Sequence, residues 1–355
     1  MTDEATPDWF VPPERIRFES PSIGGVAKAD PEDFVVVEQP LYEPGGDGGH
    51  LFLRVEKRDV PHDRMVAAIA ELLSCPANRV RFAGRKDRRA VTTQWVSIET
   101  TRTVSPGPIA DGVAIKDVSR HTNGLKLGHL ASNLFQLRVR GVAADAERSV
   151  RETIDQLGNR FANTFGSQRF GFEQRTLRDG LASLDAPPAR QRGGKGLQTL
   201  QLASVQAALF NRVLAARNAA GLLSTVLTGD VVGFPGRGGL FLAEQTEVEQ
   251  QRLERGETCL TGPLPGAKSK RPIAAAAEFE RQVLTQCGVD HESLTPFRSL
   301  IRGTRRPLTV GPEWTAIEAT CHRDRGDDLR LTFVLPPGSY ATSLLAQLGI
   351  TVWSG

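Results

Sequence analysis

Two segments far apart in the chain alternate between apolar and polar residues, and this alternation is the strongest constraint on the fold. In residues 133–141 (NLFQLRVRG), Phe135, Leu137 and Val139 fall on one face of a strand, with polar residues between them. Residues 329–340 (LRLTFVLPPGSY) repeat the pattern near the C-terminus. Such alternation is typical of antiparallel strands with one face buried and the other exposed. We therefore expect a sheet to which the final strand returns after the middle of the chain.

The first third of the chain has further strand patterns, whereas the middle is helical in character. Strand-like runs occupy residues 33–40, 51–57 and 94–99. Apolar residues at helical spacing predict helices at 62–74, 145–158, 197–218 and 274–288, the last two long and amphipathic. A chain of 355 residues is long for a single core, which favours two domains. We expect an α+β fold in which a more helical domain, residues 160–305, is inserted into a sheet domain.

Composition excludes several classes of protein. The net charge is only +3, so affinity for a nucleic acid has to come from local basic patches. The four cysteines lie far apart without a CxxC pair, which excludes a zinc ribbon or a disulfide framework and indicates a reducing compartment. The chain has no signal-peptide pattern at its start and no apolar run of about 18 residues. We expect a cytoplasmic protein without a membrane segment.

Motifs for common cofactors are also absent from the sequence. It contains no GxxxxGK[ST] loop, no GxGxxG after a strand and no GxSxG elbow. Its six histidines include no HxxxH pair, which makes a metal site improbable. We expect neither a nucleotide cofactor nor a metal.

One short segment concentrates charge around a single acid. In residues 83–99 (AGRKDRRAVTTQWVSIE), Asp87 is flanked by Arg85, Lys86, Arg88 and Arg89. Nearby guanidinium groups favour an ionised carboxylate, and the same groups bind phosphates. A solvated basic turn and a site built for a polyanion explain this spacing equally well, so both interpretations stay open.

Three other segments place candidate binding residues beside ordinary structural ones. In residues 28–38 (KADPEDFVVVE), a surface charge and a core residue are the default interpretations of Lys28 and Phe34. In residues 121–137, a turn residue and a core residue are the defaults for Asn133 and Phe135. In NTFGSQRFGF (163–172), phenylalanines beside basic and amide groups suit RNA base stacking or a packed hinge, and the hinge is preferred.

Together, these segments resemble the TruD family of tRNA pseudouridine synthases. The resemblance rests on five motifs that follow one another in family order between residues 28 and 348: KADPEDFVVVE, GRKDRRAVTTQ, HTNGLKLGHLASNLFQLRVR, NTFGSQRFG and LPPGSYATSLLAQL. It implies a catalytic domain formed by residues 1–159 and 306–355, with an inserted TRUD domain at 160–305 and a cleft between them. It also implies a substrate, uridine 13 in the D-arm of tRNA.

The resemblance assigns roles residue by residue. Asp87 matches the catalytic aspartate, and Lys28 the basic residue that keeps it ionised. The positions matching nucleotide-binding residues are Phe34, Asn133, Phe135 and Tyr340. We assign RNA-backbone contact to Arg85, Arg88, Arg89 and Arg169. Two positions depart from the family pattern, because Tyr340 stands in place of phenylalanine and Ser132 in place of glycine.

Pseudouridine formation fits the missing cofactor motifs, because the reaction is an isomerisation without a redox change or an energy input. A carboxylate can add to the sugar C1′ or remove a proton from C2′, and the sequence does not separate these routes. A non-catalytic RNA-binding protein or tRNA chaperone on the same scaffold is the main alternative. A phosphate hydrolase is weaker, because no DxD or HxE motif accompanies the charged cluster. We expect a monomer whose partner is tRNA.

Overall fold

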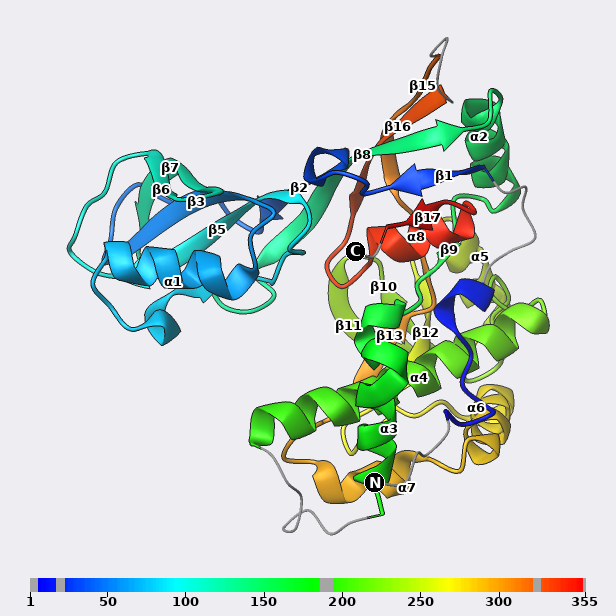
Figure 1. Cartoon of the computed structure of the whole chain (residues 1–355). Helices are drawn as coiled ribbons and strands as arrows, with labels where there is room; N and C mark the ends of the chain where they lie inside the picture. The colour runs from blue at the N-terminus through cyan, green and yellow to red at the C-terminus, as the bar shows by residue number, and fades with distance from the viewer. Residues whose placement is uncertain (1–5, 17–22, 186–193, 322–326, 354–355) are drawn as a thin grey trace. The chain divides into compact units, whose positions relative to one another are not determined.

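The computed structural model describes residues 6–16, 23–185, 194–321 and 327–353 (Figure 1). The chain forms two compact units, which are described separately. The first, here called the sheet unit, comprises Ser20–Asn159, Gly311–Ala341 and Leu348–Gly355. The second, the helical unit, comprises Met1–Glu19, Arg160–Val310 and Thr342–Gln347. The expected inserted domain, residues 160–305, falls within the helical unit, while the assignment of the two units as catalytic and TRUD domains stays a prediction.

The sheet unit is built on one 11-stranded mixed sheet. Its main strands run in the order β15-β16-β8-β2-β5-β3-β7-β6, with β1 beside β8, β17 beside β1 and β4 beside β5. The bounds are β1 (Gly24–Ala27), β2 (Phe34–Pro40), β3 (His50–Arg58), β4 (Arg81–Phe82), β5 (Val91–Glu99), β6 (Gly107–Ala110), β7 (Val113–His121), β8 (Leu130–Val142), β15 (Glu313–Thr320), β16 (Asp327–Leu335) and β17 (Thr351–Val352). The pairs β2–β5 and β1–β17 are parallel, and the other pairs are antiparallel. The sheet is thus mixed but mostly antiparallel, and the antiparallel pairing that the alternating segments predict is confirmed.

The two alternating segments become neighbouring strands, as the sequence predicts. In the β8–β16 pair, Phe135 lies opposite Phe333, Leu137 opposite Leu331, and the next inward pair is Val139 with Leu329. All six side chains are buried. Cross-strand apolar pairs of this kind fix the register, because a slip by one residue would turn each buried side chain to the other face.

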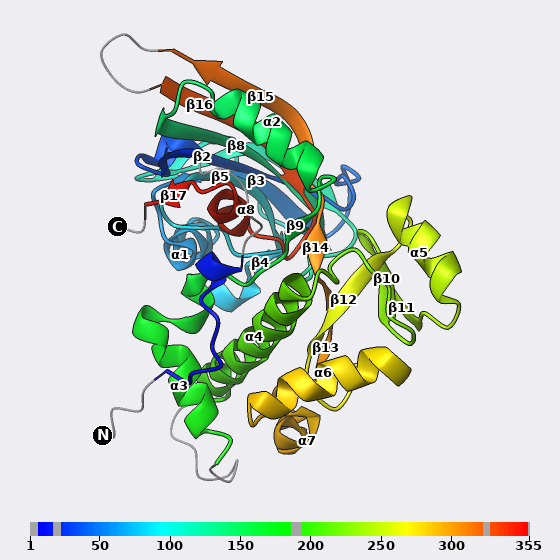
Figure 2. The same cartoon turned by 90° about the vertical axis from the view of Figure 1, so that its right-hand side faces the viewer.

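Two helices pack on the sheet. The helix α1 (His62–Leu72) places Met65 and Ile69 in one core cluster with Leu53, Val96 and Ile115 from β3, β5 and β7 (Figure 1). The helix α2 (Ala146–Gln156) packs against β15, as Figure 2 shows. Both helices lie where the apolar spacing predicts them.

The helical unit is organised around the 25-residue helix α4 (Lys195–Ala219). The other helices are α3 (Arg175–Ala182), α5 (Thr246–Glu254), α6 (Ala274–Gln286), α7 (His291–Leu294) and α8 (Ala341–Gln347). A four-stranded antiparallel sheet has the order β11-β10-β12-β13, with bounds Arg237–Leu242, Val231–Phe234, Cys259–Leu264 and Thr304–Pro307. The short strands β9 (Phe161–Ala162) and β14 (Thr309–Val310) pair with each other.

The prediction that α4 has one apolar stripe is wrong, because the helix is buried on nearly all sides between residues 201 and 217. Its polar side chains are buried because they have partners. Asn211 accepts a hydrogen bond from the Phe165 backbone N–H and donates to the Phe165 carbonyl oxygen, both at 2.9 Å. Arg217 forms an ion pair with Asp230 at 2.5 Å. In the described ranges, no helix is long and apolar enough to cross a membrane.

Candidate active site

Asp87 lies on the loop between β4 and β5, where its side chain is 40% exposed. The Lys28 ammonium lies 2.6 Å from the carboxylate, and the Lys28 side chain is almost fully buried. The contact between these two residues, which are 59 positions apart in the chain, is the one that the sequence analysis expects. A buried ammonium needs an anionic partner to offset its desolvation, and the Asp87 carboxylate is placed to be that partner.

The backbone of Lys28 is in an unusual conformation. Its φ angle of 66° lies in the left-handed region, which residues with a side chain rarely adopt. The Lys28 ammonium also lies 4.7 Å from the centre of the Phe34 ring. Strained backbone of this kind persists only where the surrounding structure holds it, and it occurs often at functional sites.

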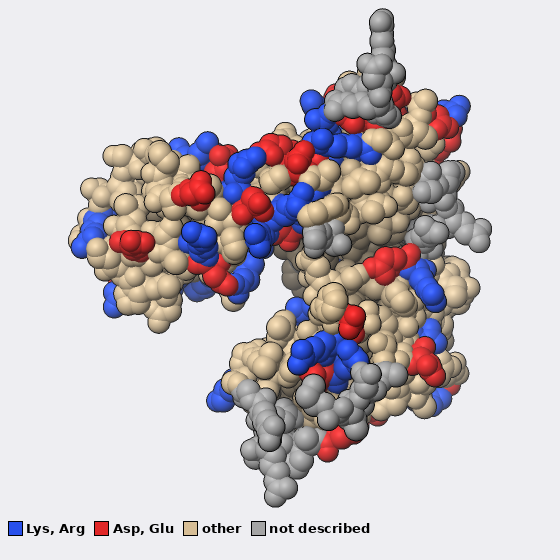
Figure 3. Space-filling model, viewed as in Figure 1, with Lys and Arg blue, Asp and Glu red and all other residues tan. Residues whose placement is uncertain are grey.

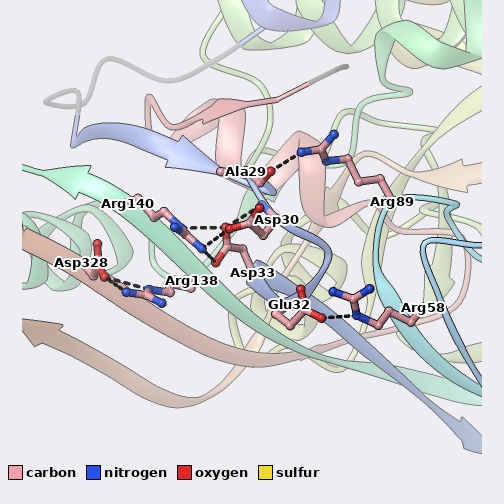
Figure 4. Close-up of polar contacts among 9 residues, drawn as sticks. All are labelled: Ala29, Asp30, Glu32, Asp33, Arg58, Arg89, Arg138, Arg140 and Asp328. Carbon is pink, nitrogen blue, oxygen red and sulfur yellow. Dashed lines mark hydrogen bonds and ion pairs between the residues drawn. The ribbon is translucent and has the colours of Figure 1, made fainter. Parts of the chain in front are cut away.

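The turn that follows Lys28 is held by three arginines, which Figure 4 shows around residues 29–33. Arg89 donates to the Ala29 carbonyl oxygen, and its guanidinium lies 3.4 Å from the centre of the Trp353 ring. Arg140 binds Asp33 through two hydrogen bonds of 2.8 and 2.9 Å and also binds Asp30. Arg58 pairs with Glu32. These contacts explain how the strained backbone at Lys28 is kept in place.

The loop that carries Asp87 is anchored on both sides. At its start, the Gln94 amide donates to the Gly84 carbonyl oxygen at 3.1 Å. Next to Asp87, the Lys86 ammonium lies 2.6 Å from the Glu38 carboxylate, and both side chains are buried. Burial raises the pKa of Glu38, and the positive charge of Lys86 opposes that shift. Gln94, which lies in β5 with the threonines of the motif, thus anchors the start of the loop.

Lys57 is a residue of this site that the sequence analysis missed. It is fully buried near the end of β3 and donates a hydrogen bond to the backbone carbonyl oxygen of Asp87. Burial lowers its pKa to about 8, against the opposing charge of Asp87. A signal for it was present in the sequence, because Lys57 continues the inward positions of Leu51, Leu53 and Val55.

The predicted nucleotide-binding residues lie in different settings. Phe34 and Phe135 are both buried, with ring centres 6.1 Å apart in a T-shaped contact. Asn133 pairs in register with Glu38, and its buried side-chain oxygen has no hydrogen-bond partner among the described residues. Tyr340 lies between β16 and α8 and is 41% exposed.

The predicted RNA-backbone residues also differ from one another. Arg85 and Arg88 are exposed and have the acidic neighbours Asp63 and Asp59, the latter pair at 3.9 Å. Arg169 belongs to the helical unit, where its guanidinium lies 5.8 Å from the Phe165 ring centre. On the face of the sheet unit in Figure 3, Lys and Arg side chains alternate with Asp and Glu side chains. Within the described part of the chain, no group of three or more His, Cys, Asp or Glu side chains is placed to hold a metal ion.

The fold and the site define an α+β protein with an accessible carboxylate paired to a buried lysine, an arrangement suited to a nucleophile or a base. The family model described as "tRNA pseudouridine synthase D (TruD)" matches residues 15–179 and 173–348. The chain belongs to the TruD family. The fold class and the family resemblance of the sequence are thereby confirmed.

Individual relatives agree with this assignment over nearly the whole chain. A protein named tRNA pseudouridine synthase D from Anaeromyxobacter sp. (strain Fw109-5) is 36% identical over 335 residues, which cover 93% of this chain and 94% of the relative. A protein of the same name from Thermus thermophilus is 35% identical over 345 residues, covering 95% and 92%. A solved structure from Methanosarcina mazei, described under the name TruD, has 22% identity and a TM-score of 0.75 and covers 98% and 99%. That structure supports the fold.

Proposed function

We propose that this chain is a tRNA pseudouridine synthase, an isomerase that converts uridine 13 in the D-arm of tRNA to pseudouridine with Asp87 as its catalytic carboxylate. The observation that carries the proposal is the pairing of a half-exposed carboxylate with a buried lysine on strained backbone. The carboxylate is open to a substrate, while the cation paired with it is shielded from water.

The reaction needs one charged oxygen near the sugar. The N1–C1′ bond breaks, and its electron pair leaves with uracil. The Asp87 carboxylate either bonds to C1′ or removes the C2′ proton, and both routes remain open. After the uracil turns, C5 bonds to C1′ as the Asp87–C1′ bond breaks or, on the other route, as Asp87 returns the proton to C2′. The proton on C5 is then lost and N1 gains a proton. Substrate and product are isomers, so the reaction balances without a nucleotide, a metal or a redox cofactor.

The uridine has to leave its stack to reach Asp87, which costs a few kcal/mol. The unpartnered side-chain oxygen of Asn133 supports a role in accepting a hydrogen bond from uracil N3–H, because a buried acceptor without a partner is costly. Phe34 offers aromatic surface close to the Lys28 ammonium, and Phe135 contacts the Phe34 ring. Tyr340 is exposed enough to contact the nucleotide.

Recognition of the rest of the tRNA falls to basic side chains. Arg85 and Arg88 are exposed and suited to phosphate contact. Arg169 remains assigned to the RNA backbone on the basis of the family motif. The contacts of Arg89 with Ala29 and Trp353 favour a role in holding the Lys28 turn over its assigned contact with RNA. We further propose that the protein acts as a monomer in the cytoplasm.

The Asp87→Asn variant tests the proposal. It keeps the size of the side chain but removes the charge, so pseudouridine formation should fall at least about 10³-fold while tRNA affinity changes less than about threefold. The measurement is release of tritium from tRNA labelled at uracil C5, with mapping of pseudouridine along the product. Asp111→Asn, an exposed aspartate in the turn between β6 and β7, is the matched control.

Two results would count against the proposal. If Asp87→Asn kept the wild-type rate, Asp87 would not be catalytic. If the unaltered protein bound tRNA but formed no pseudouridine at position 13, a non-catalytic RNA-binding role would be favoured.

A further inference from the structure

Three lysines hold the Asp87 loop in place, and each of them contacts a different acceptor group. Lys28 binds the Asp87 carboxylate, and Lys86, the neighbour of Asp87, reaches Glu38. Lys57 instead binds the main chain of Asp87, through the backbone carbonyl oxygen. The side chain and the main chain of Asp87 are thus held by separate cations.

The burial of Lys57 is the unusual feature. Lys57 occupies an inward position of β3, and the preceding inward positions of that strand are apolar. Lysine is rarely fully buried unless its charge is paired or hydrogen-bonded. Thr92 lies directly opposite it on β5. The charged groups around it are Asp87 and Asp59, which favour its protonated form, and Lys28 and Lys86, which oppose it. A leucine at this position would fill the same core without the cost of desolvation.

We infer that Lys57 is a positioning residue for the proposed reaction, which fixes the main chain of Asp87 so that the carboxylate stays aimed at the substrate sugar. The inference rests on the proposed function of Asp87. Lys28 alone cannot supply this constraint, because an ion pair at the end of the Asp87 side chain leaves the loop backbone able to shift. A displacement of about 1 Å at a reacting group can lower the rate about 10²-fold.

This role has a pH signature. Burial lowers the pKa of Lys57 to about 8, so the ammonium loses its proton as the pH rises through that value. The neutral amine is a weaker donor to the Asp87 carbonyl oxygen, and a positive charge beside the carboxylate disappears. Turnover should therefore fall above pH 8, while the affinity for tRNA stays the same.

The test compares Lys57→Met with Lys116→Met, which removes an exposed lysine of β7 in the same sheet. In Lys57→Met, kcat should fall about 10²-fold with KM changed less than about threefold, and the remaining activity should no longer decline near pH 8. Lys57→Arg, which keeps a charged donor throughout this range, should recover part of kcat and also lack the decline. Lys116→Met should match the wild type in all three respects.

Hydrogen exchange of residues 84–90 gives a readout that does not depend on activity. In Lys57→Met, these amides should exchange at least about tenfold faster than in the wild type, with exchange in β8 unchanged. Unchanged exchange in the loop, or full kcat with the wild-type pH profile, would overturn the inference. If the wild type formed no pseudouridine but the loop exchange rose as expected, the proposed function would fail, whereas the hold of Lys57 on the Asp87 loop would be supported. If exchange rose throughout the sheet unit, Lys57 would be a residue for overall stability only, and the inference would be wrong.

Discussion

Phe135 is the residue for which a role in the hydrophobic core and a proposed role in stacking on uracil have to be distinguished. It is 7% exposed and lies between two rings, in a stacked contact with Phe333 at 5.4 Å and a T-shaped contact with Phe34 at 6.1 Å. The sequence motif assigns Phe135 to the uracil, whereas its place on β8 assigns it to the core. Replacing the ring separates these two roles.

The Phe135→Ala variant should be much less stable. Removing a buried phenylalanine ring lowers the free energy of unfolding by about 3–5 kcal/mol, and each lost aromatic pair contributes about 0.5–1.5 kcal/mol beyond the buried area. Domains have only about 5–15 kcal/mol of stability, so activity lost by this variant would have two causes that cannot be separated. The low exposure of Phe135 therefore makes alanine a poor probe of its role with the nucleotide.

Leucine gives the sharper experiment, with Phe333→Leu as the matched control. Phe333 is fully buried and lies directly opposite Phe135 in the β8–β16 register. Leucine keeps a large apolar side chain at either position, so both variants should lose less stability than the corresponding alanine variants. Stacking on a base is worth about 1–3 kcal/mol, so Phe135→Leu should lower kcat/KM about 5- to 150-fold, while Phe333→Leu stays within about threefold of the wild type.

The assay pairs urea unfolding with tritium release, measured at a temperature at which both variants are folded. If the two variants lost the same stability and the same kcat/KM, the ring of Phe135 would be a core residue and its assignment to the uracil would be refuted.

Two further predictions concern charge. Changing Arg85 and Arg88 to Gln should weaken tRNA binding and reduce the slope of log K against log salt by up to about two, measured between about 50 and 200 mM salt. Arg148→Gln, on the exposed face of α2, is the control, and an unchanged slope in the double variant would exclude phosphate contact by the pair. Burial, aided by Arg85, lowers the pKa of His62 to about 4. The contribution of His62 to the free energy of unfolding is therefore fully present above about pH 6.5. Up to about 3 kcal/mol of it is lost as the pH falls towards 4. Urea unfolding at pH 7 and 4.5 should show that His62→Phe loses less stability between these pH values than the wild type does. Equal losses of stability would contradict the lowered pKa of His62.

The strands could be predicted from the sequence because their alternation is a local property. The pattern in 133–141 and 329–335 determines which side chains point inward, and burying both sets favours the pairing of β8 with β16. The burial of α4 on nearly all sides was not predictable in the same way. Its polar residues Asn211 and Arg217 are buried because of partners elsewhere in the chain, and no spacing within the helix identifies those partners.

The candidate site was predictable in part. The family motifs identify Asp87 and Lys28, but the local charge pattern left a solvated turn equally open. Glu38 and Lys57 could have been noticed, because each occupies an inward position of an otherwise apolar strand face. A charge at such a position predicts a buried partner without identifying it, since the partner depends on which strands become neighbours.

The order of strands around β5 explains why these residues meet. The Asp87 loop precedes β5, so it lies at the end of the sheet where β5 begins. The strand β2 is parallel to β5, with Val35 opposite Val91, so its start and the preceding Lys28 lie at that same end. The strand β3 is antiparallel to β5, with Lys57 opposite Thr92, so the end of β3 lies there as well. One parallel neighbour and one antiparallel neighbour therefore bring Lys28 to the Asp87 carboxylate and Lys57 to its backbone carbonyl oxygen. If β2 ran antiparallel to β5, its start would lie at the opposite end of the pair, about 20 Å away for a strand of this length. The one parallel pairing within the main strand order is thus the feature of the fold on which the proposed site depends most.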